Sequence, residues 1–128
     1  MAAVTSVSVD IATPRLRLLV LQPTPFCNID CEYCYLPNRN ERDRMPFDIV
    51  EAAVRFVFDH SLAAPDFTIV WHSGEPLVLP VEWYRQAFAS ALRGGPAGTH
   101  IPHSVQTNGM LVNDEWCSFS AAIQFAWA

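Results

Sequence analysis

The sequence has 128 residues, a net charge of −5 and a composition that is 51% hydrophobic but only 16% charged. This length supports one domain with a hydrophobic core, and the composition excludes a disordered chain. The negative charge argues against nucleic acid or an anionic membrane as the main partner. Residues 1–14 have no basic start and no long apolar run, so we expect a flexible lead-in rather than a signal peptide or a membrane anchor. Four cysteines without a secretory signal predict a location in the reducing cytoplasm.

Two short apolar runs, at residues 16–21 and 67–71, predict buried β-strands, and the run at residues 103–107 is predicted to be a third short strand. Each run is followed by a loop rich in proline, glycine or asparagine and then by a helical pattern. The first helix is predicted to begin at Pro46 and the second to cover residues 81–93. The third is predicted to begin at Glu115, after a cap at Asn113 or Asp114.

The first two helical patterns are amphipathic. In the first helix, Glu51 and Arg55 predict an ion pair at spacing i,i+4 on the polar side. The apolar side of this helix is expected to consist of Ile49, Ala53, Phe56 and Val57. Gly94 and Gly95 are expected to end the second helix. Its apolar side is expected to consist of Val81, Tyr84, Ala87, Phe88, Ala91 and Leu92.

The order of strand, loop and helix occurs three times, which predicts an α/β fold with a parallel sheet and right-handed crossovers. Ligands of such sheets bind beyond the carboxyl ends of the strands. Three distinctive loops follow the three strands, and they contain residues 22–45, residues 72–80 and the turn at Asn108 and Gly109. We therefore expect these loops to meet at one edge of the sheet.

The first of these loops contains Cys27, Cys31 and Cys34 at the spacing C-x3-C-x2-C. Iron–sulfur clusters usually take four cysteines, so a three-cysteine cluster leaves one iron open to a substrate or cofactor. A structural zinc site is the alternative, but it normally needs a second ligand pair, and His100 and His103 are the pair with suitable spacing. The spacing differs from that of bacterial ferredoxins, and no oxidising compartment is indicated that would favour a disulfide.

The spacing C-x3-C-x-aromatic-C, formed by Cys27, Cys31, Tyr33 and Cys34, resembles the signature of the radical S-adenosylmethionine (radical SAM) enzymes. Further segments extend the resemblance to SPASM-type peptide maturases: QPTPF at 22–26, YLPNR at 35–39, WHSGEPL at 71–77 and QTNG at 106–109. Within that group, the sequence is most similar to those of the cyclophane-forming maturases, which act on glycine-rich precursor peptides. The resemblance covers residues 15–117 and implies the N-terminal half of a partial (β/α)6 barrel.

The resemblance implies that Cys27, Cys31 and Cys34 hold a [4Fe–4S] cluster and that SAM binds the open iron. An electron from an external donor would cleave SAM to a 5′-deoxyadenosyl radical, which removes a hydrogen atom from the precursor peptide. Tyr33 corresponds to the aromatic residue that lies beside the adenine of SAM in the family. A packed loop aromatic is the alternative interpretation of Tyr33.

Two other loops are implied to contact SAM. Ser73, Gly74 and Glu75 correspond to the family's Gly-Gly-Glu segment, which receives the methionine end of SAM, and Ser73 departs from the commoner glycine. Gly74 permits close approach of the backbone, and Glu75 or backbone carbonyls can accept a hydrogen bond from an ammonium. Asn108 would border the ribose, although an ordinary turn at the end of a strand is an equally good interpretation.

Three further residues have simpler expected roles. We expect His72 to be a loop histidine and Arg39 to be a solvated surface arginine, with contact to a carboxylate as the alternative for Arg39. Cys117 belongs to no motif, and we expect it to be a core residue of the third helix.

Residues 118–128 carry no charge and do not resemble the family's continuation. We therefore expect a truncated or frame-shifted product, or a fragment, with the inner apolar face of its half-barrel uncovered. Such a chain is expected to bind a cluster but to turn over poorly or not at all. The alternatives are a maturase that oxidises a serine or cysteine of sulfatases and a non-catalytic metal-binding remnant that associates with a partner chain.

Overall fold

The computed structural model describes residues 15–123 and 125–127, so the lead-in expected for residues 1–14 lies outside the described residues. These residues form a four-stranded parallel sheet with the strand order β1-β2-β3-β4. A short 3₁₀ helix, η1 (Pro76–Val78), follows the second strand. The strands and α-helices alternate as β1 (Leu16–Leu21), α1 (Phe47–Asp59), β2 (Ala63–Trp71), α2 (Val81–Gly94), β3 (His103–Val105), α3 (Asp114–Ile123) and β4 (Ala126–Trp127).

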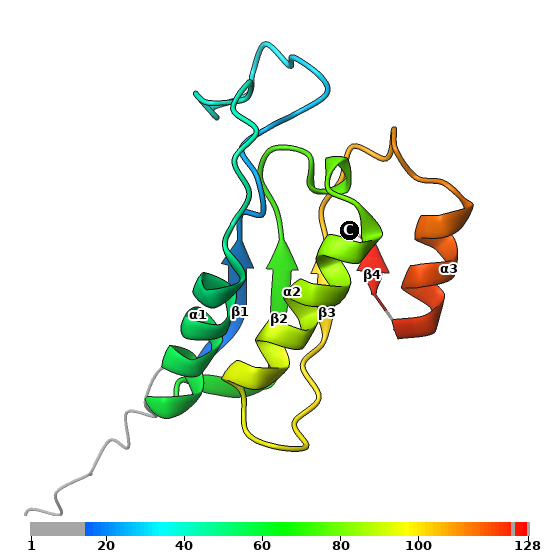
Figure 1. Ribbon diagram of the computed structural model, residues 1–128. Helices are drawn as coiled ribbons and strands as arrows, with labels where there is room; N and C mark the ends of the chain where they lie inside the picture. The colour runs from blue at the N-terminus through cyan, green and yellow to red at the C-terminus, as the bar shows by residue number, and fades with distance from the viewer. Residues whose placement is uncertain (1–14, 124, 128) are drawn as a thin grey trace, which may run out of the picture.

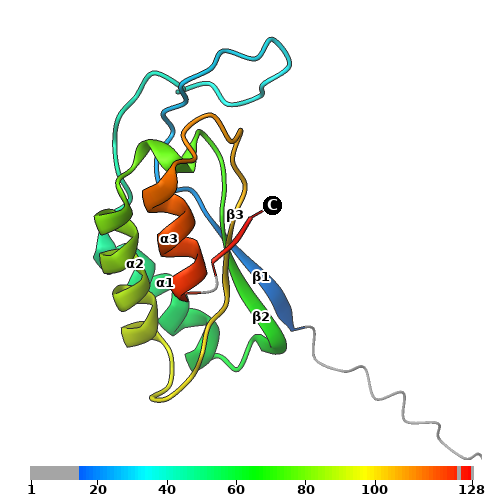
Figure 2. The ribbon, with the colours of Figure 1, turned by 90° about the vertical axis from the view of Figure 1, so that its right-hand side faces the viewer.

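The three α-helices pack on the same face of the sheet (Figure 1, Figure 2). Between the helices and the sheet lies a core in which Trp71, Tyr84 and Val105 are fully buried. The rings of Trp71 and Tyr84 meet edge-on, with their centroids 5.6 Å apart. Burial of each large apolar side chain contributes about 1.5–3 kcal/mol to folding. The predicted α/β fold with a parallel sheet is therefore confirmed.

The opposite face of the sheet carries no helix in the described part of the chain (Figure 2). On this face Leu16, Leu18 and Val20 alternate along β1 and are 41%, 57% and 54% exposed. Leu18 lies beside Thr68 of β2 in the parallel ladder. These exposed apolar side chains correspond to the uncovered inner face that is expected when only part of a barrel is present.

The buried side of α1 differs from the prediction. Val50, Val54 and Val57 are buried, whereas Ile49 and Phe56 are 50% and 57% exposed. The three valines recur at spacing i, i+4 and i+7, and this stripe faces the core. The sequence did not separate the two stripes, because hydrophobic residues lie on both.

The polar side of α1 contains the predicted ion pair. The Glu51 carboxylate lies 2.6 Å from Arg55 and 3.1 Å from Arg93 of α2. These two arginines lower the pKa of Glu51, mainly through the hydrogen bond from Arg93. The prediction of an ion pair within α1 is confirmed, and the contact from α2 is an addition to it.

The later elements also differ in detail from the sequence-based expectations. Leu92 is 54% exposed on α2, whereas Trp83, which was not expected on the apolar side, is buried. Cys117 is exposed on α3 rather than part of the core, because Trp116 and Phe119 occupy the buried stripe of that helix. The amide of Trp116 donates to the side chain of Asn113, which identifies Asn113 as the cap of α3.

Regular structure continues in the described part of residues 118–128. Residues 118–123 complete α3, and Phe125 is buried in the core. Ala126 and Trp127 pair in parallel with Ser104 and Val105 of β3.

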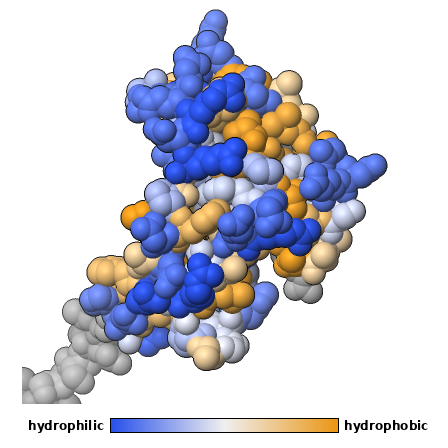
Figure 3. Space-filling view, viewed as in Figure 1, coloured by the Kyte–Doolittle hydropathy of each residue, from blue (hydrophilic) through white to orange (hydrophobic). Residues whose placement is uncertain are grey.

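The loop that follows β1 projects beyond the carboxyl ends of the strands (Figure 1). It includes an unbroken run of polar and charged residues, 38–44, and the projecting region is hydrophilic in the surface view (Figure 3). None of the described helices combines the length and the apolar character needed to cross a membrane.

Candidate functional site

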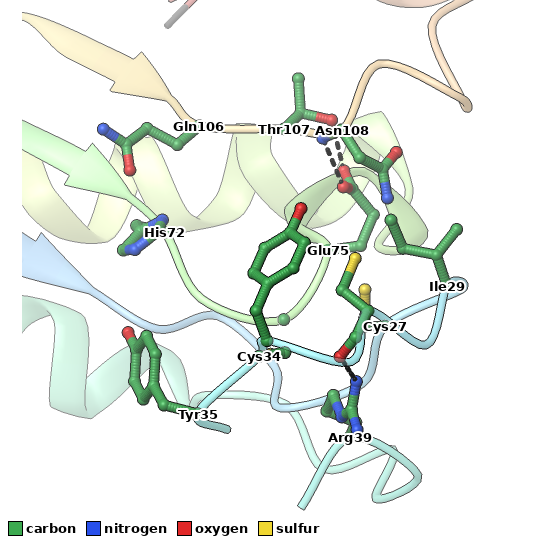
Figure 4. A pocket seen from close by; sticks show the side chains of 13 residues that line it. Cys27, Ile29, Cys34, Tyr35, Arg39, His72, Glu75, Gln106, Thr107 and Asn108 are labelled. Carbon is green, nitrogen blue, oxygen red and sulfur yellow. Dashed lines mark hydrogen bonds between the residues drawn. The ribbon is translucent and has the colours of Figure 1, made fainter. Parts of the chain in front are cut away.

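A pocket of about 410 Å³ lies at the carboxyl edge of the sheet, where the loops after β1, β2 and β3 meet (Figure 4). The loop after β1 contributes the three cysteines to its wall. The loop after β2 contributes Gly74 and Glu75, and the loop after β3 contributes Thr107 and Asn108. The prediction that the three loops converge at one edge of the sheet is confirmed.

The thiols of Cys27, Cys31 and Cys34 are free and partly buried. Among the residues that the structure describes, no three His, Cys, Asp or Glu side chains converge on the position of a single metal ion. A [4Fe–4S] cluster makes a different demand, because each cysteine binds a separate iron of a cube-shaped group. Three soft thiolates around one open pocket fit such a cluster in the type of donor and in space.

Arg39 lies against the part of the first loop that contains the three cysteines, called the cysteine loop below. The expectation of a solvated arginine is therefore wrong. Its Nη1 donates to the carbonyl of Cys31 at 3.0 Å, and its Nη2 lies 2.6 Å from the carboxylate of Asp30. Its side chain is only 25% exposed. The backbone carbonyl of Arg39 also accepts from the amide of Cys27 at 3.0 Å. Arg39 therefore contacts the segment between the first two cysteines at both ends.

Ser73 and Gly74 both have left-handed backbone conformations, with φ of 82° and 65°. A side chain at Gly74 would place its Cβ 2.5 Å from the carbonyl oxygen of Thr24 and 2.7 Å from that of Phe26. Only glycine permits this approach of the β2 loop to the cysteine loop. Ser73 adopts a conformation that glycine tolerates better, which gives a physical reason for the glycine that is commoner at this position.

Glu75 is 1% exposed, and three donors of the chain bond to its carboxylate. Its Oε1 accepts from the amide of Leu77 at 3.0 Å and from the hydroxyl of Thr107. Its Oε2 accepts from the amide of Asn108 at 2.9 Å (Figure 4). The amide of Glu75 donates to the carbonyl of Phe26 at 2.8 Å. This residue therefore joins the loops that follow all three strands.

Asn108 extends the connection to the cysteine loop. Its side-chain amide donates to the side-chain oxygen of Asn28 at 2.9 Å, although the two residues are 80 positions apart. Its side-chain oxygen accepts from the amide of Met110, which forms the predicted turn. Asn108 thus lines the pocket and also completes a turn at the end of β3.

Tyr33 lines the pocket but is 90% exposed, so its ring is not packed in the core of the domain. A hydrogen bond with the side chain of Cys31 raises the pKa of Tyr33, and the charges of Cys31 and Cys34 add to this effect. The ring is available to a ligand that enters the pocket.

Sequence reasoning missed three polar or aromatic residues of the pocket wall: Tyr35, His72 and Gln106. His72 follows the last residue of β2, and Gln106 follows the last residue of β3. The amide of His72 donates to the carbonyl of Leu21, and that of Gln106 donates to the carbonyl of Trp71. For His72 the position directly after a predicted strand was a usable signal, because such residues lie at the ligand-binding edge of a parallel sheet. Gln106 gave no such signal, because the third strand was expected to continue to residue 107 and instead ends at Val105.

The three cysteine thiols lie at the carboxyl edge of a parallel sheet, which is where the ligands of such sheets bind. The sequence model of the Radical SAM superfamily matches residues 21–122, and the chain belongs to this superfamily. The matched range includes the cysteine loop and all the residues of the pocket. The superfamily expected from the cysteine spacing is confirmed.

The chain is similar to part of several larger proteins. It is 41% identical over 105 residues to an uncharacterized protein of Synechocystis sp., a match that covers 79% of this chain and 26% of that protein. It is 36% identical over 116 residues to the serine-type anaerobic sulfatase-maturating enzyme of Klebsiella pneumoniae, with 83% of this chain and 28% of that enzyme covered. The chain therefore spans less than a third of the length of these relatives.

The fold is shared with solved structures. Native anSMEcpe with bound AdoMet and Kp18Cys peptide matches this chain with a TM-score of 0.71 at 23% sequence identity. The match covers 86% of this chain and 30% of that one. At this level of identity the likeness establishes the fold.

Proposed function

We propose that this chain holds a [4Fe–4S] cluster and SAM at the carboxyl edge of its sheet, as the cofactor-binding part of a radical SAM enzyme. The observation that carries the proposal is the convergence of Cys27, Cys31 and Cys34 on one pocket with Gly74 and Glu75. Thiolates are the ligands that iron–sulfur clusters take. Three thiolates leave one iron of such a cluster without a protein ligand, and SAM can occupy that position.

The charge of Glu75 supports a cationic ligand in the pocket. This buried carboxylate lines the pocket, and within residues 15–123 and 125–127 its bonds come from neutral donors rather than from a salt bridge. A buried charge is costly unless it is paired, and the ammonium and sulfonium groups of SAM are positive. Oε2 accepts one bond from the chain, so a lone pair remains for an ammonium.

The chain's own residues position these groups. Cys27, Cys31 and Cys34 would hold the cluster, whose chemistry would be transfer of one electron to SAM so that a radical able to remove a hydrogen atom from a carbon is formed. In our proposal Ser73 and Gly74 offer backbone carbonyls to the ammonium of SAM, Tyr33 lies along its adenine, and Asn108 borders its ribose. Because oxygen destroys such clusters, a reducing compartment such as the cytoplasm suits the three free thiols.

We propose a peptide or protein as the substrate. The Klebsiella pneumoniae relative, a serine-type sulfatase-maturating enzyme, favours oxidation of a serine side chain in a sulfatase. The sequences of residues 35–39 and 71–77 resemble those of cyclophane-forming maturases and favour instead a crosslink in a glycine-rich precursor. The relatives make the first substrate the stronger candidate.

These two substrates can be separated by one assay. Oxidation of a serine to an aldehyde and formation of a crosslink both remove two hydrogens from the peptide, so the mass change is the same. An aldehyde-specific hydrazide labels only the product of serine oxidation. Hydrazide labelling of a treated sulfatase peptide supports the first substrate, and an unlabelled product of a treated glycine-rich peptide supports the second.

The proposal is tested by anaerobic reconstitution of the full chain with iron and sulfide. We expect about four iron and four sulfide per chain, as the composition of the cluster requires. The cluster should be lost in Cys31→Ala and retained in Cys117→Ala, because Cys117 is exposed on α3 away from the pocket. The reduced protein should change its EPR spectrum when SAM is added, since SAM binds to the iron itself.

Three other outcomes would overturn the proposal in different ways. One zinc per chain without sulfide would indicate a non-catalytic metal-binding protein. A cluster whose EPR spectrum ignores SAM would leave the metal site but remove the SAM site. Equal iron content in Cys31→Ala and wild-type protein would show that the cysteine loop is not the site.

A further inference from the structure

The cysteine loop contains no helix or strand between Cys27 and Cys34, so its shape depends on individual contacts. Inside this segment the one backbone hydrogen bond runs from the amide of Cys34 to the carbonyl of Cys31, at 3.1 Å. That bond fixes the second and third cysteines relative to each other. It leaves the separation of the first and second cysteines unspecified.

Arg39 supplies the missing constraint. Its backbone carbonyl accepts from the amide of Cys27 at 3.0 Å, and its guanidinium donates to the carbonyl of Cys31 at 3.0 Å (Figure 4). The same guanidinium pairs with Asp30 at 2.6 Å. One residue thus spans the C-x3-C segment from its first cysteine to its second.

Arg39 and Asp30 differ in how far their side chains are buried, and the more buried one has less freedom to move. The side chain of Arg39 is 25% exposed, whereas that of Asp30 is 90% exposed. The planar guanidinium presents several donors in a fixed arrangement, so it can hold a carbonyl and a carboxylate at once, which an ammonium does less well. Arg39 is therefore the more firmly held of the two residues, and its contacts hold Asp30 and Cys31 in place.

We propose that Arg39 is a positioning residue for the iron–sulfur cluster: it sets the separation of Cys27 and Cys31 and balances the charge of Asp30 beside the cluster. This inference rests on the proposed function, because it assigns a role within that same site. Hydrogen bonds and net charge around a cluster help set its reduction potential. Removal of Arg39 leaves Asp30 unbalanced, which makes the potential more negative.

The first test uses hydrogen exchange in the full chain without a cluster. We expect Arg39→Gln to raise the exchange rates of the amides of Cys27 and Cys34, the two amides of residues 27–34 that donate to the chain, by about tenfold or more, while the amides of β2 are unchanged. Arg44→Gln is the matched control, because Arg44 lies on the same segment but lines a separate groove with Gln22 and Pro37. Equal exchange in the two variants would overturn the proposal.

The second test uses the reconstituted cluster. Arg39→Gln should lose iron to a chelator about 10–100-fold faster than wild-type protein, the usual effect of removing a residue that orients metal ligands. Its reduction potential should be more negative, and that of Asp30→Asn should be more positive. Arg39→Lys should restore the potential but not the retention of iron, because it keeps the charge and loses the planar fork.

The two tests separate failure of this inference from failure of the proposed function. If wild-type protein takes up no cluster, the proposed function fails, and the exchange experiment still decides whether Arg39 orders the loop. If wild-type protein takes up a cluster and Arg39→Gln matches it in iron retention and potential, the positioning role is refuted.

Discussion

Replacement of Gly74 by alanine would test the close approach of the β2 loop to the cysteine loop. A Cβ at this position would lie 2.5 Å from the oxygen of Thr24, 2.7 Å from the oxygen of Phe26 and 2.9 Å from the carbonyl carbon of Pro25. All three atoms belong to the backbone, so no side-chain rotation relieves the contact. The two loops must move apart.

The expected loss has three parts. The left-handed backbone at φ 65° costs an alanine about 1–2 kcal/mol. Overpacking against rigid backbone adds about 1–3 kcal/mol. Separation of the loops also breaks the 2.8 Å hydrogen bond from the amide of Glu75 to the carbonyl of Phe26, a loss of about 1 kcal/mol. The total of about 3–6 kcal/mol is a large fraction of the stability of a small domain.

Urea unfolding followed by tryptophan fluorescence measures this loss. Gly98→Ala is the matched control, since Gly98 also has a positive φ, of 78°, but a Cβ there meets nothing within 4 Å. The control should lose only the backbone contribution, about 1–2 kcal/mol. Equal losses in the two variants would refute the argument that Gly74 is required by the approach of the loops.

Ser73 has a φ of 82°, so Ser73→Gly should raise the free energy of unfolding by about 0.5–1 kcal/mol after the greater flexibility of glycine in the unfolded chain is subtracted. A lower stability in urea unfolding would contradict this. Glu75→Gln places a side-chain NH₂ group against backbone N–H donors and should lower the free energy of unfolding by about 2–4 kcal/mol. The control Glu82→Gln, on the exposed side of α2, should change it by less than about 1 kcal/mol. Similar losses in the two variants would count against the role of Glu75. Burial, with a smaller contribution from His100, lowers the pKa of His103 to about 3. Because the unfolded imidazole binds a proton below about pH 6.5 and the folded one does not, stability should be constant above that pH and fall by about 2 kcal/mol by pH 5. In urea unfolding at several pH values, His103→Phe should remove this slope between pH 7 and pH 5, and an unchanged slope would exclude His103 as its cause.

The topology of the sheet was predictable from the sequence because it follows from the order of elements. The strand that ends at Trp71 stands out as an apolar run, and the strand that begins at His103 was placed by its position before the turn at Asn108 and Gly109. The start of β2 did not stand out, because residues 63–66 read Ala-Ala-Pro-Asp and have little preference for strands. Leu16 nevertheless pairs with Ala63, across an irregularity in the ladder. The start of β2 is therefore set by its pairing with β1 and not by the strand preference of its own residues.

The site was predictable where its residues are neighbours in the chain. The spacing of Cys27, Cys31 and Cys34 is visible in the sequence, and the structure places all three on one pocket. The roles of Arg39 and Glu75 were not visible, since they depend on partners in other segments. Arg39 bonds eight positions back to Cys31, and Glu75 bonds 32 positions forward to Thr107.

The proposed cofactor site therefore depends on the pairing of β1, β2 and β3 and not on the cysteine loop alone. Two of the contacts that order this loop come from elsewhere in the fold: Gly74 lies against Thr24 and Phe26, and Asn108 bonds to Asn28. The first contact requires β1 and β2 to be paired, and the second also requires β3 to be paired with β2, because this pairing brings the carboxyl ends of the three strands to one edge. A loop ordered in advance by these contacts loses little conformational entropy when it binds a cluster, so folding of the sheet strengthens metal binding. By the same linkage, a bound cluster stabilises the folded sheet, and the resistance of the domain to urea should rise when iron and sulfide are bound.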